Sequence, residues 1–412
     1  MTEPVRSNFQ EQLNLLETTG PERISRLVDL ILTDAVRRSA SDVHFEPTHR
    51  SLEVRYRLDG VLHPVVSLSR EWSPNIAARL KVLAELLTYR LDVPQEGRIS
   101  DALGRFGVEM RVSTFPIIHG EKAVVRLFDT PGQVLDLENL GFSAEILTAL
   151  REMLRERSGA IFLTGPSGSG KTTTIYACLR SLLETSQRGQ QIVTIEDPVE
   201  QMIEGVSQSQ ARPGTEFDFA RGLRSLLRQD PEVIMIGEVR DAETASIAIE
   251  AALTGHLVFT TLHAGSACGV VSRLLDMGVE PYLLTSGLKG ILNQRLVRKL
   301  CTACKGQWAL PGTDMVLANQ TAGCEYCANT GYHGRLLLAE LLPLEAEFRQ
   351  AILAKADTAT LERAVNEPGR QTIWSAAEQA VASGRTTQRE IDRVLGPSGS
   401  PRQRVREDSN EK

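Results

Sequence analysis

A glycine-rich segment at residues 165–172, Gly-Pro-Ser-Gly-Ser-Gly-Lys-Thr, constrains the fold of this chain more than any other feature. It fits the pattern G-x-x-x-x-G-K-[ST], follows the apolar run 160–163 and precedes a plausible helix at 173–183. A strand, such a loop and a helix in that order present backbone N–H groups that bind phosphate. We therefore predict an α/β domain of the P-loop class.

The expected ligand of this loop is ATP with Mg²⁺. Glycines let the backbone approach the phosphates, Lys171 reaches the β and γ phosphates, and the hydroxyl of Thr172 ligates the magnesium ion. The residues expected to contact the nucleotide are Gly165, Pro166, Ser167, Gly168, Ser169, Gly170, Lys171, Thr172 and Thr173.

Short apolar runs, each followed directly by polar residues, predict the rest of this domain. The runs lie at residues 160–163, 192–195, 233–236 and 257–261. Continuous apolar strands are typical of a parallel sheet that is covered on both faces. The carboxyl ends of such strands meet at one edge, where open α/β folds bind ligands. We expect Glu196, Glu238 and His263 to lie at that edge.

These three side chains are the candidate catalytic groups beside Lys171. Glu238 follows the expected Walker B strand, although Gly237 takes the usual aspartate position, and we assign it to the magnesium-bound water. Glu196 is assigned to orient the attacking water. A neutral His263 is placed to sense the γ-phosphate. The alternative is a structural role, as an ordinary strand-end acid for Glu238 and as a structural histidine for His263.

The pattern also predicts a separate N-terminal domain. Apolar and charged residues alternate over 52–58, and an Asp59-Gly60 turn leads into 61–66, which predicts a hairpin with one solvated face. With a helix near 24–35, this indicates a small α+β domain. The predicted boundaries are a flexible N-terminus at 1–19, the α+β domain at 20–131, a linker at 132–139, a larger α/β domain at 140–396 and a disordered tail at 397–412.

Four cysteines form two Cys-x-x-Cys pairs, Cys301 with Cys304 and Cys324 with Cys327. The 19 residues between the pairs fit four thiolates on one structural Zn²⁺ in a loop-rich insertion at 297–335, and a redox pair is the alternative. Nearby basic residues form a patch that is suited to acidic partner segments or lipid headgroups, or is simply solvated: Arg295, Arg298, Lys299 and Lys305.

Composition narrows the partners of this chain. Its 412 residues carry a net charge of −6, so attraction to nucleic acid would need a local basic patch, and we expect no nucleic-acid partner. No stretch approaches the roughly 18 apolar residues of a spanning helix. The sequence therefore predicts a cytoplasmic protein.

The motifs together resemble the secretion-ATPase superfamily, specifically the assembly ATPases of type II secretion systems and type IV pili. Besides the P-loop and the segments around Glu196, Glu238 and His263, the matching segments are Ala-Ser-Asp-Val-His-Phe-Glu-Pro at 40–47, Arg-Tyr-Arg-Leu-Asp-Gly at 55–60, Pro-Gln-Glu-Gly-Arg-Ile-Ser at 94–100, Arg-Gln-Asp-Pro at 228–231 and Arg-Asp at 240–241. The resemblance covers roughly residues 20–395.

This resemblance implies a homohexamer in which a PAS-like N-terminal domain closes over ATP held by a RecA-like domain of the neighbouring subunit. Strand alternation puts Arg55 and Arg57 on one solvated face, so they are the expected trans contacts to the γ-phosphate. Arg98 and Arg111 are further candidates, either for trans contacts or for hinge ion pairs. The implied partners are an inner-membrane platform protein and a cytoplasmic recruitment protein, with the motor peripheral at the inner face of the cytoplasmic membrane.

The expected function is an ATPase motor that powers the assembly of pilin-like subunits. Both a type II secretion system and a type IV pilus fit this expectation. A RecA-like hexameric nucleic-acid translocase is the alternative, and it predicts a basic channel and DNA-stimulated hydrolysis. A scaffold that binds nucleotide without hydrolysis is disfavoured because Lys171, Glu196, Glu238 and His263 are all present.

Overall fold

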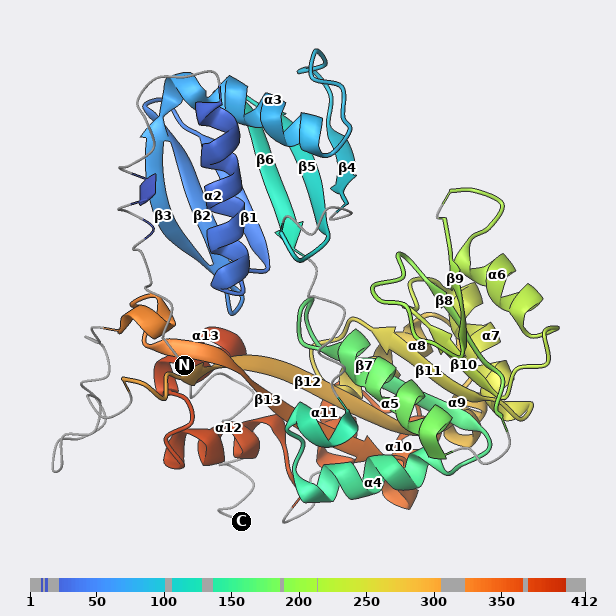
Figure 1. Cartoon of the computed structure of the whole chain (residues 1–412). Coiled ribbons are helices and arrows are strands. Elements are labelled where there is room, and N and C mark those ends of the chain that lie inside the picture. The colour runs from blue at the N-terminus through green and yellow to red at the C-terminus, as the bar shows by residue number, and fades with distance from the viewer. Residues whose placement is uncertain are drawn as a thin grey trace, which may run out of the picture. The chain divides into compact units, whose positions relative to one another are not determined.

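The computed structural model divides into two compact units, residues 1–133 and 134–412 (Figure 1). It describes residues 9, 12–13, 22–100, 106–127, 136–185, 189–212, 214–304, 323–365 and 370–397. The predicted tail beyond residue 397 and most of the predicted flexible segment 1–19 lie outside the described residues. Within that segment, Phe9 is buried against the core of the first unit.

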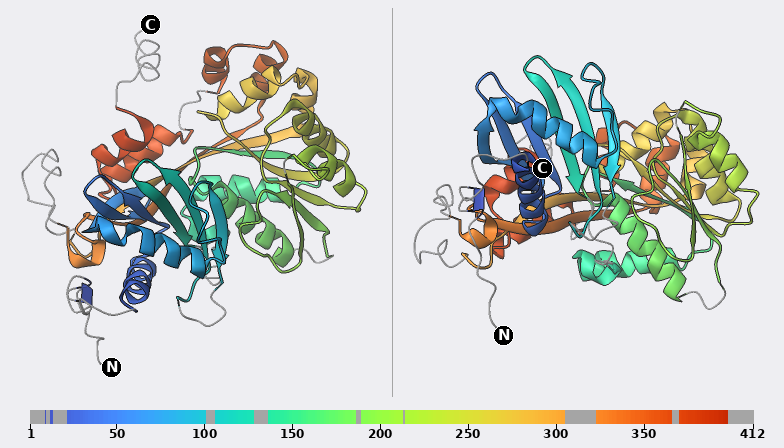
Figure 2. Two further views of the ribbon diagram at one scale, coloured as in Figure 1. Left: turned by 90° about the horizontal axis from the view of Figure 1, so that it is seen from above. Right: turned by 45° about the horizontal axis from the view of Figure 1, so that its top comes forward.

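The smaller unit is one antiparallel sheet covered by helices on one face. The strand order is β3-β2-β1-β6-β5-β4. Both views in Figure 2 place α2 and α3 on the same side of it. The elements are α2 (Arg23–Arg37), β1 (Asp42–Pro47), β2 (Ser51–Leu58), β3 (Val61–Ser69), η1 (Arg70–Trp72), α3 (Ser73–Leu83), β4 (Gln95–Ile99), β5 (Met110–Ile117) and β6 (Gly120–Leu127).

The predicted hairpin is present as β2 and β3, with Asp59 and Gly60 at positive φ in the turn. In β2, Leu52, Val54 and Tyr56 are buried under the helices. The alternate residues of the strand lie on the opposite face, which the described helices of this unit leave open. The sheet therefore presents its charged residues on one open face.

The larger unit is a seven-stranded sheet in the order β13-β12-β7-β11-β10-β8-β9. Its first elements are η2 (Leu137–Leu140), α4 (Ala144–Leu154), β7 (Gly159–Thr164), α5 (Lys171–Thr185), β8 (Ile192–Glu196), β9 (Val206–Gln210), α6 (Phe219–Leu226), β10 (Val233–Ile236), α7 (Ala242–Leu253) and β11 (Leu257–Leu262). They are followed by α8 (Ala267–Asp276), α9 (Pro281–Gly287), β12 (Leu288–Leu300), η5 (Glu325–Cys327), β13 (Tyr332–Pro343), α10 (Ala346–Leu353), α11 (Thr358–Ala364), α12 (Ile373–Ala382) and α13 (Gln388–Leu395).

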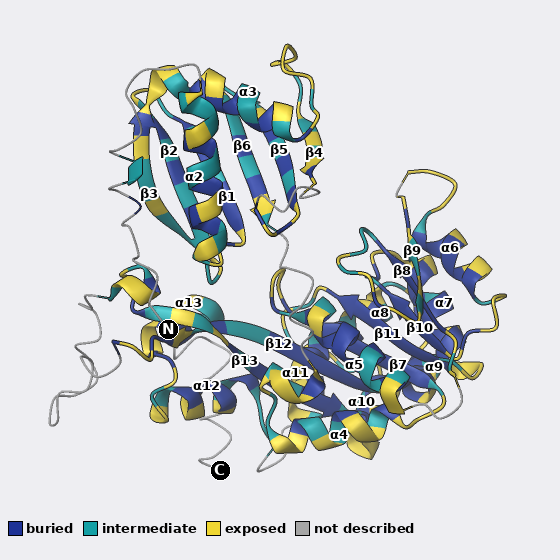
Figure 3. Ribbon diagram, in the orientation of Figure 1, coloured by how far each residue is buried: buried dark blue, intermediate teal, exposed yellow. Residues whose placement is uncertain are grey.

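Helices cover both faces of this sheet, as the continuous apolar strands predict. Residues of α4 and α5 share one buried cluster with the sheet, and residues of α6 to α11 share another. Figure 3 shows the central strands buried along their length and the outer sides of the helices exposed. The predicted α/β fold with a smaller α+β unit is confirmed.

The sheet is not wholly parallel, because β13 runs antiparallel to β12. The 13-residue strand β12, which pairs with β7, was not predicted at all. Its mixed sequence, Leu-Lys-Gly-Ile-Leu-Asn-Gln-Arg-Leu-Val-Arg-Lys-Leu, gives neither a continuous apolar run nor a clean alternation. Helices α12 and α13 pack on the far part of the β12–β13 hairpin.

Candidate active site

The phosphate-binding loop joins the end of β7 to the start of α5 (Figure 1). Gly165, Gly168 and Gly170 have φ values of 145°, 74° and 90°, which side chains disfavour. A Cβ at Gly165 would also lie 2.4 Å from the carbonyl oxygen of Gln294 in β12. The first glycine is therefore required both by its backbone conformation and by the neighbouring strand.

Lys171 is folded into its own loop. Its ammonium donates hydrogen bonds to the carbonyl oxygens of Gly165, at 2.8 Å, and Pro166, at 3.0 Å. Burial and then the charge of Arg295 lower the pKa of Lys171 to about 8, while Glu238 acts to raise it. A bound phosphate would supply the negative charge that favours the protonated ammonium. The side chain predicted to bind phosphate, that of Lys171, therefore already lies within the loop.

Glu238 and His263 come together at the predicted edge of the sheet. Glu238 follows β10 and His263 follows the adjacent strand β11, with 4.0 Å between Oε2 and Nε2. Arg240 forms an ion pair with Glu238 and also lies 4.0 Å from the carboxylate of Asp197. The carboxylate, the imidazole and the guanidinium therefore form one cluster at this edge of the sheet.

Glu196 lies at the end of β8 but is enclosed. Only 2% of the residue is exposed, and both carboxylate oxygens accept hydrogen bonds. The donors are the hydroxyls of Tyr176 and Thr194 and the amide of Gln208, the last at 3.2 Å. Water can reach Glu196 only if one of these donors moves aside.

The interpretation of Arg295 as part of a basic patch beside the cysteines was wrong. Its guanidinium donates to the carbonyl oxygen of Gly265 at 2.9 Å. A Cβ at Gly165 would lie 3.2 Å from one of its terminal nitrogens. Arg295 therefore stands at the phosphate-binding loop, where recognition of β12 as the neighbour of β7 would have placed it.

The predicted trans arginines lie on the open face of the smaller unit, each beside an acid of β1. Arg57 Nε is 3.2 Å from Asp42 Oδ2, and Arg55 forms an ion pair with Glu46. Register explains the pairing in part, because Asp42 is directly opposite Arg57. Sequence reasoning missed Arg126, which lies opposite Asp42 on the other side and is 3.2 Å from it.

The two further arginine candidates lie on β4 and β5 of the same sheet. Arg98 and Arg111 are directly opposite each other in the register. Arg111 forms an ion pair with Glu96, and Arg98 is exposed. The structure thus places all four predicted arginines on one unit.

The four cysteines gather at the end of the β12–β13 hairpin. Their sulfur atoms all lie within 4.8 Å of one another, and three of the distances are 3.8, 3.9 and 3.8 Å. A tetrahedron of sulfurs with metal bonds of about 2.3 Å has edges of about 3.8 Å, whereas a disulfide needs about 2.05 Å. A hydrogen bond with the backbone of Cys327 contributes most to lowering the pKa of Cys324 to about 7. The donor set therefore fits a metal and not a disulfide.

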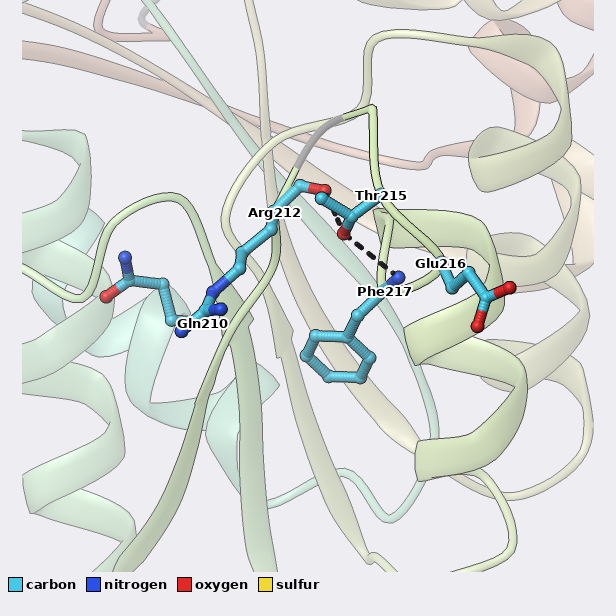
Figure 4. Close-up of a pocket in the computed structure, with 5 residues that line it drawn as sticks. All are labelled: Gln210, Arg212, Thr215, Glu216 and Phe217. Atoms are coloured by element: carbon cyan, nitrogen blue, oxygen red, sulfur yellow. Dashed lines mark hydrogen bonds between the residues drawn. The ribbon is translucent and has the colours of Figure 1, made fainter.

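A surface cavity of about 500 Å³ lies beside the end of β9, and Figure 4 shows the side chains that line it. It is lined by Gln210, Arg212, Thr215, Glu216 and Phe217. None of these five lining residues is a predicted site residue. The strand β9 is the outermost of the sheet, and β7, which leads to the phosphate-binding loop, lies four strands away.

Among the described residues, none of the helices has the length and apolar character required to cross a bilayer.

A family model described as "Type II/IV secretion system protein" matches residues 17–393. A relative in Escherichia coli K12, "Putative type II secretion system protein E", is 42% identical over 391 residues, which cover 92% of this chain and 78% of the relative. The "Type II secretion system ATPase E" of Vibrio cholerae is 41% identical over 395 residues, with 93% and 78% covered.

Solved structures show the same architecture. The pilus retraction motor PilT with bound ADP is 25% identical, with a TM-score of 0.59, and 92% of this chain and 98% of that chain are covered. The Legionella pneumophila ATPase DotB has a TM-score of 0.67 at 23% identity, with the same coverage of both chains, and supports the fold.

Proposed function

We propose that this chain, which belongs to the type II/IV secretion system protein family and hydrolyses ATP, is the motor of a type II secretion system. The observation that carries the proposal is the length of the similarity. The chain is 41% identical over 93% of its residues to an ATPase whose name assigns it to type II secretion. The phosphate-binding loop, Glu238 and His263 supply the chemistry in the larger unit.

We further propose how this chemistry is divided. Lys171 binds the β and γ phosphates, Thr172 would hold the Mg²⁺ ion, and Glu238 would hold the water bound to that ion, which neutralises charge on the phosphates when bound. His263 responds to the γ-phosphate. Glu196 orients the attacking water after releasing one of its present donors, Tyr176 or Thr194.

The arginines of the smaller unit support a proposed homohexamer. Arg55 and Arg57 are oriented by acids on an open face, and an arginine supplied by a neighbouring subunit stabilises the transition-state charge. The proposed partners are an inner-membrane platform protein and a cytoplasmic recruitment protein, with the motor peripheral at the cytoplasmic membrane.

The proposed zinc is structural. Cys301, Cys304, Cys324 and Cys327 would hold it, and it would stabilise the tip of the β12–β13 hairpin rather than act on the nucleotide.

Removal of the Lys171 side chain tests this function. Lys171→Ala protein is expected to lose ATP turnover, and cells that express it in place of the wild-type chain are expected to lose secretion while assembling the other components. Turnover that rises on addition of DNA, together with intact secretion by Lys171→Ala, would favour the nucleic-acid translocase instead.

A further inference from the structure

Two buried threonine hydroxyls tie together the three strand ends that carry the active site. The strands β7, β11 and β10 are adjacent and parallel, and they lead to the phosphate-binding loop, His263 and Glu238 respectively. We propose that Thr164 and Thr261 are positioning residues for ATP hydrolysis, which fix the spacing of these three elements through hydrogen bonds to the main chain. The proposal rests on the proposed roles of Glu238 and His263.

Thr164 links the phosphate-binding loop to the histidine. It is fully buried, ends β7 and immediately precedes Gly165. Its hydroxyl accepts a hydrogen bond from the backbone N–H of Ala264 at 3.1 Å and donates one to the carbonyl oxygen of Ala264 at 3.2 Å. One hydroxyl therefore binds both the backbone N–H and the backbone carbonyl of Ala264, the residue that follows His263.

Thr261 links the histidine strand to the carboxylate. It is 4% exposed, and its hydroxyl donates to the carbonyl oxygen of Gly237 at 2.7 Å. Its own carbonyl oxygen accepts from the backbone N–H of Val239 at 2.9 Å. Gly237 and Val239 flank Glu238, so Thr261 holds the main chain on both sides of that residue.

A hydrogen bond from Arg295 holds the same turn as Thr164 does. Arg295 donates to the carbonyl oxygen of Gly265, in the same turn as His263, while its guanidinium lies against Gly165. Thr164 of β7 and Arg295 of β12 therefore both hold the turn after β11 close to the start of the phosphate-binding loop. A displacement of the loop by incoming phosphate is transmitted to His263 and, through Thr261, to Glu238.

The neighbouring Thr260 shows that burial alone does not explain these bonds. It is also fully buried in β11, yet among the described residues its hydroxyl has no hydrogen-bond partner. The sheet interior thus tolerates a threonine hydroxyl without a partner. The two hydroxyls that are bonded are those that reach the turns of the active site, and Thr260 serves as a matched control.

The test is removal of each hydroxyl with retention of side-chain shape. Thr164→Val and Thr261→Val are expected to lower kcat by roughly 10- to 100-fold, because small displacements of catalytic groups have effects of that size, and to leave the KM for ATP and the affinity for ADP within about threefold of wild type. Thr260→Val is expected to keep kcat. Thr164→Ser and Thr261→Ser retain the hydroxyl and should recover most of the rate.

Thermal unfolding and ADP binding are measured for each variant, and an alanine variant replaces any valine variant that does not fold. Equal kcat for Thr164→Val, Thr261→Val and Thr260→Val would overturn the proposal. Failure of the serine variants to recover the rate would overturn it as well. Glu238→Gln is included as the reference. If it hydrolyses ATP normally, the proposed role of Glu238 fails, whereas an inactive Glu238→Gln beside fully active valine variants refutes only the positioning role.

Discussion

The guanidinium of Arg57 lies beside the carboxylate of Asp42, with 3.2 Å between Nε and Oδ2. The side chain of Asp42 is only 8% exposed and pairs with Arg126 as well. An arginine held by a largely buried acid keeps one orientation on the open face of its sheet. Arg57 therefore requires little reorganisation to bind an anion such as a γ-phosphate.

We expect Arg57→Ala to lower ATP turnover by roughly 10³-fold, since loss of an arginine finger has effects of that size. The zinc content and the thermal unfolding temperature should stay close to wild type. Arg26→Ala, which removes an exposed arginine of α2, is the control and should keep full turnover. Steady-state hydrolysis measured under conditions where the wild type is oligomeric checks this.

Mixing distinguishes action across subunits from action within one chain. Arg57→Ala subunits mixed with Glu238→Gln subunits should recover part of the activity, because some interfaces pair an intact arginine with an intact glutamate. Normal turnover by Arg57→Ala alone would end the assignment, and Arg98 and Arg111 would be tested next.

The two carboxylates of the larger unit should respond differently to amide substitution. Glu238→Gln is expected to bind ATP but to lose at least 10²-fold in turnover. Glu196→Gln should also lose turnover, and it should unfold at a lower temperature, because both oxygens of the native carboxylate accept hydrogen bonds and the amide turns one of these acceptors into a donor. Nucleotide binding, turnover and thermal unfolding measured together separate the two effects. A Glu196→Gln protein with wild-type turnover would remove Glu196 from the catalytic set.

Metal analysis of protein purified without chelator should find one zinc per chain. Cys304→Ser is expected to lose the zinc and to unfold at a lower temperature, because bound metal contributes to folding. Cys268→Ala changes a buried cysteine outside the cluster and should keep the zinc. Absence of metal from the wild-type protein would contradict the zinc assignment.

Glu390 should contribute a pH-dependent part of the stability. Burial acts to raise the pKa of this fully buried side chain, but hydrogen bonds from Arg393 and Arg298 outweigh it and lower the pKa below its ordinary value of 4.5. A lowered pKa stabilises the fold above that value, and the contribution is lost as the pH falls through the folded pKa. Glu390→Gln is expected to lose about 3 kcal/mol of unfolding free energy at pH 7 and less below pH 4.5.

Denaturant unfolding at pH 7 and at a pH below 4.5 measures this difference. The control is Glu378→Gln, which changes an exposed glutamate of α12. An equal deficit of Glu390→Gln at both pH values would contradict the linkage.

Sequence pattern alone predicts three parts of the site: the phosphate-binding loop, the edge with Glu238 and His263, and the cysteine cluster. Each rests on local chemistry: glycines that need positive φ, polar residues directly after apolar strands, and Cys-x-x-Cys spacing. It also determined that Arg55 and Arg57 share a face, because the two-residue period of a strand fixes this without knowledge of its neighbours.

The distant residues that meet these groups become known from strand pairing and helix packing. Arg126 reaches Asp42 because β6 pairs with β1, and Arg295 reaches the phosphate-binding loop because β12 pairs with β7. The enclosure of Glu196 by Tyr176 likewise depends on how α5 packs on β8. Strand pairing and helix packing join residues far apart in the chain, and no local pattern records them. For the same reason, the sequence pattern did not predict the hydrogen bonds that Thr164 and Thr261 make across the strand ends.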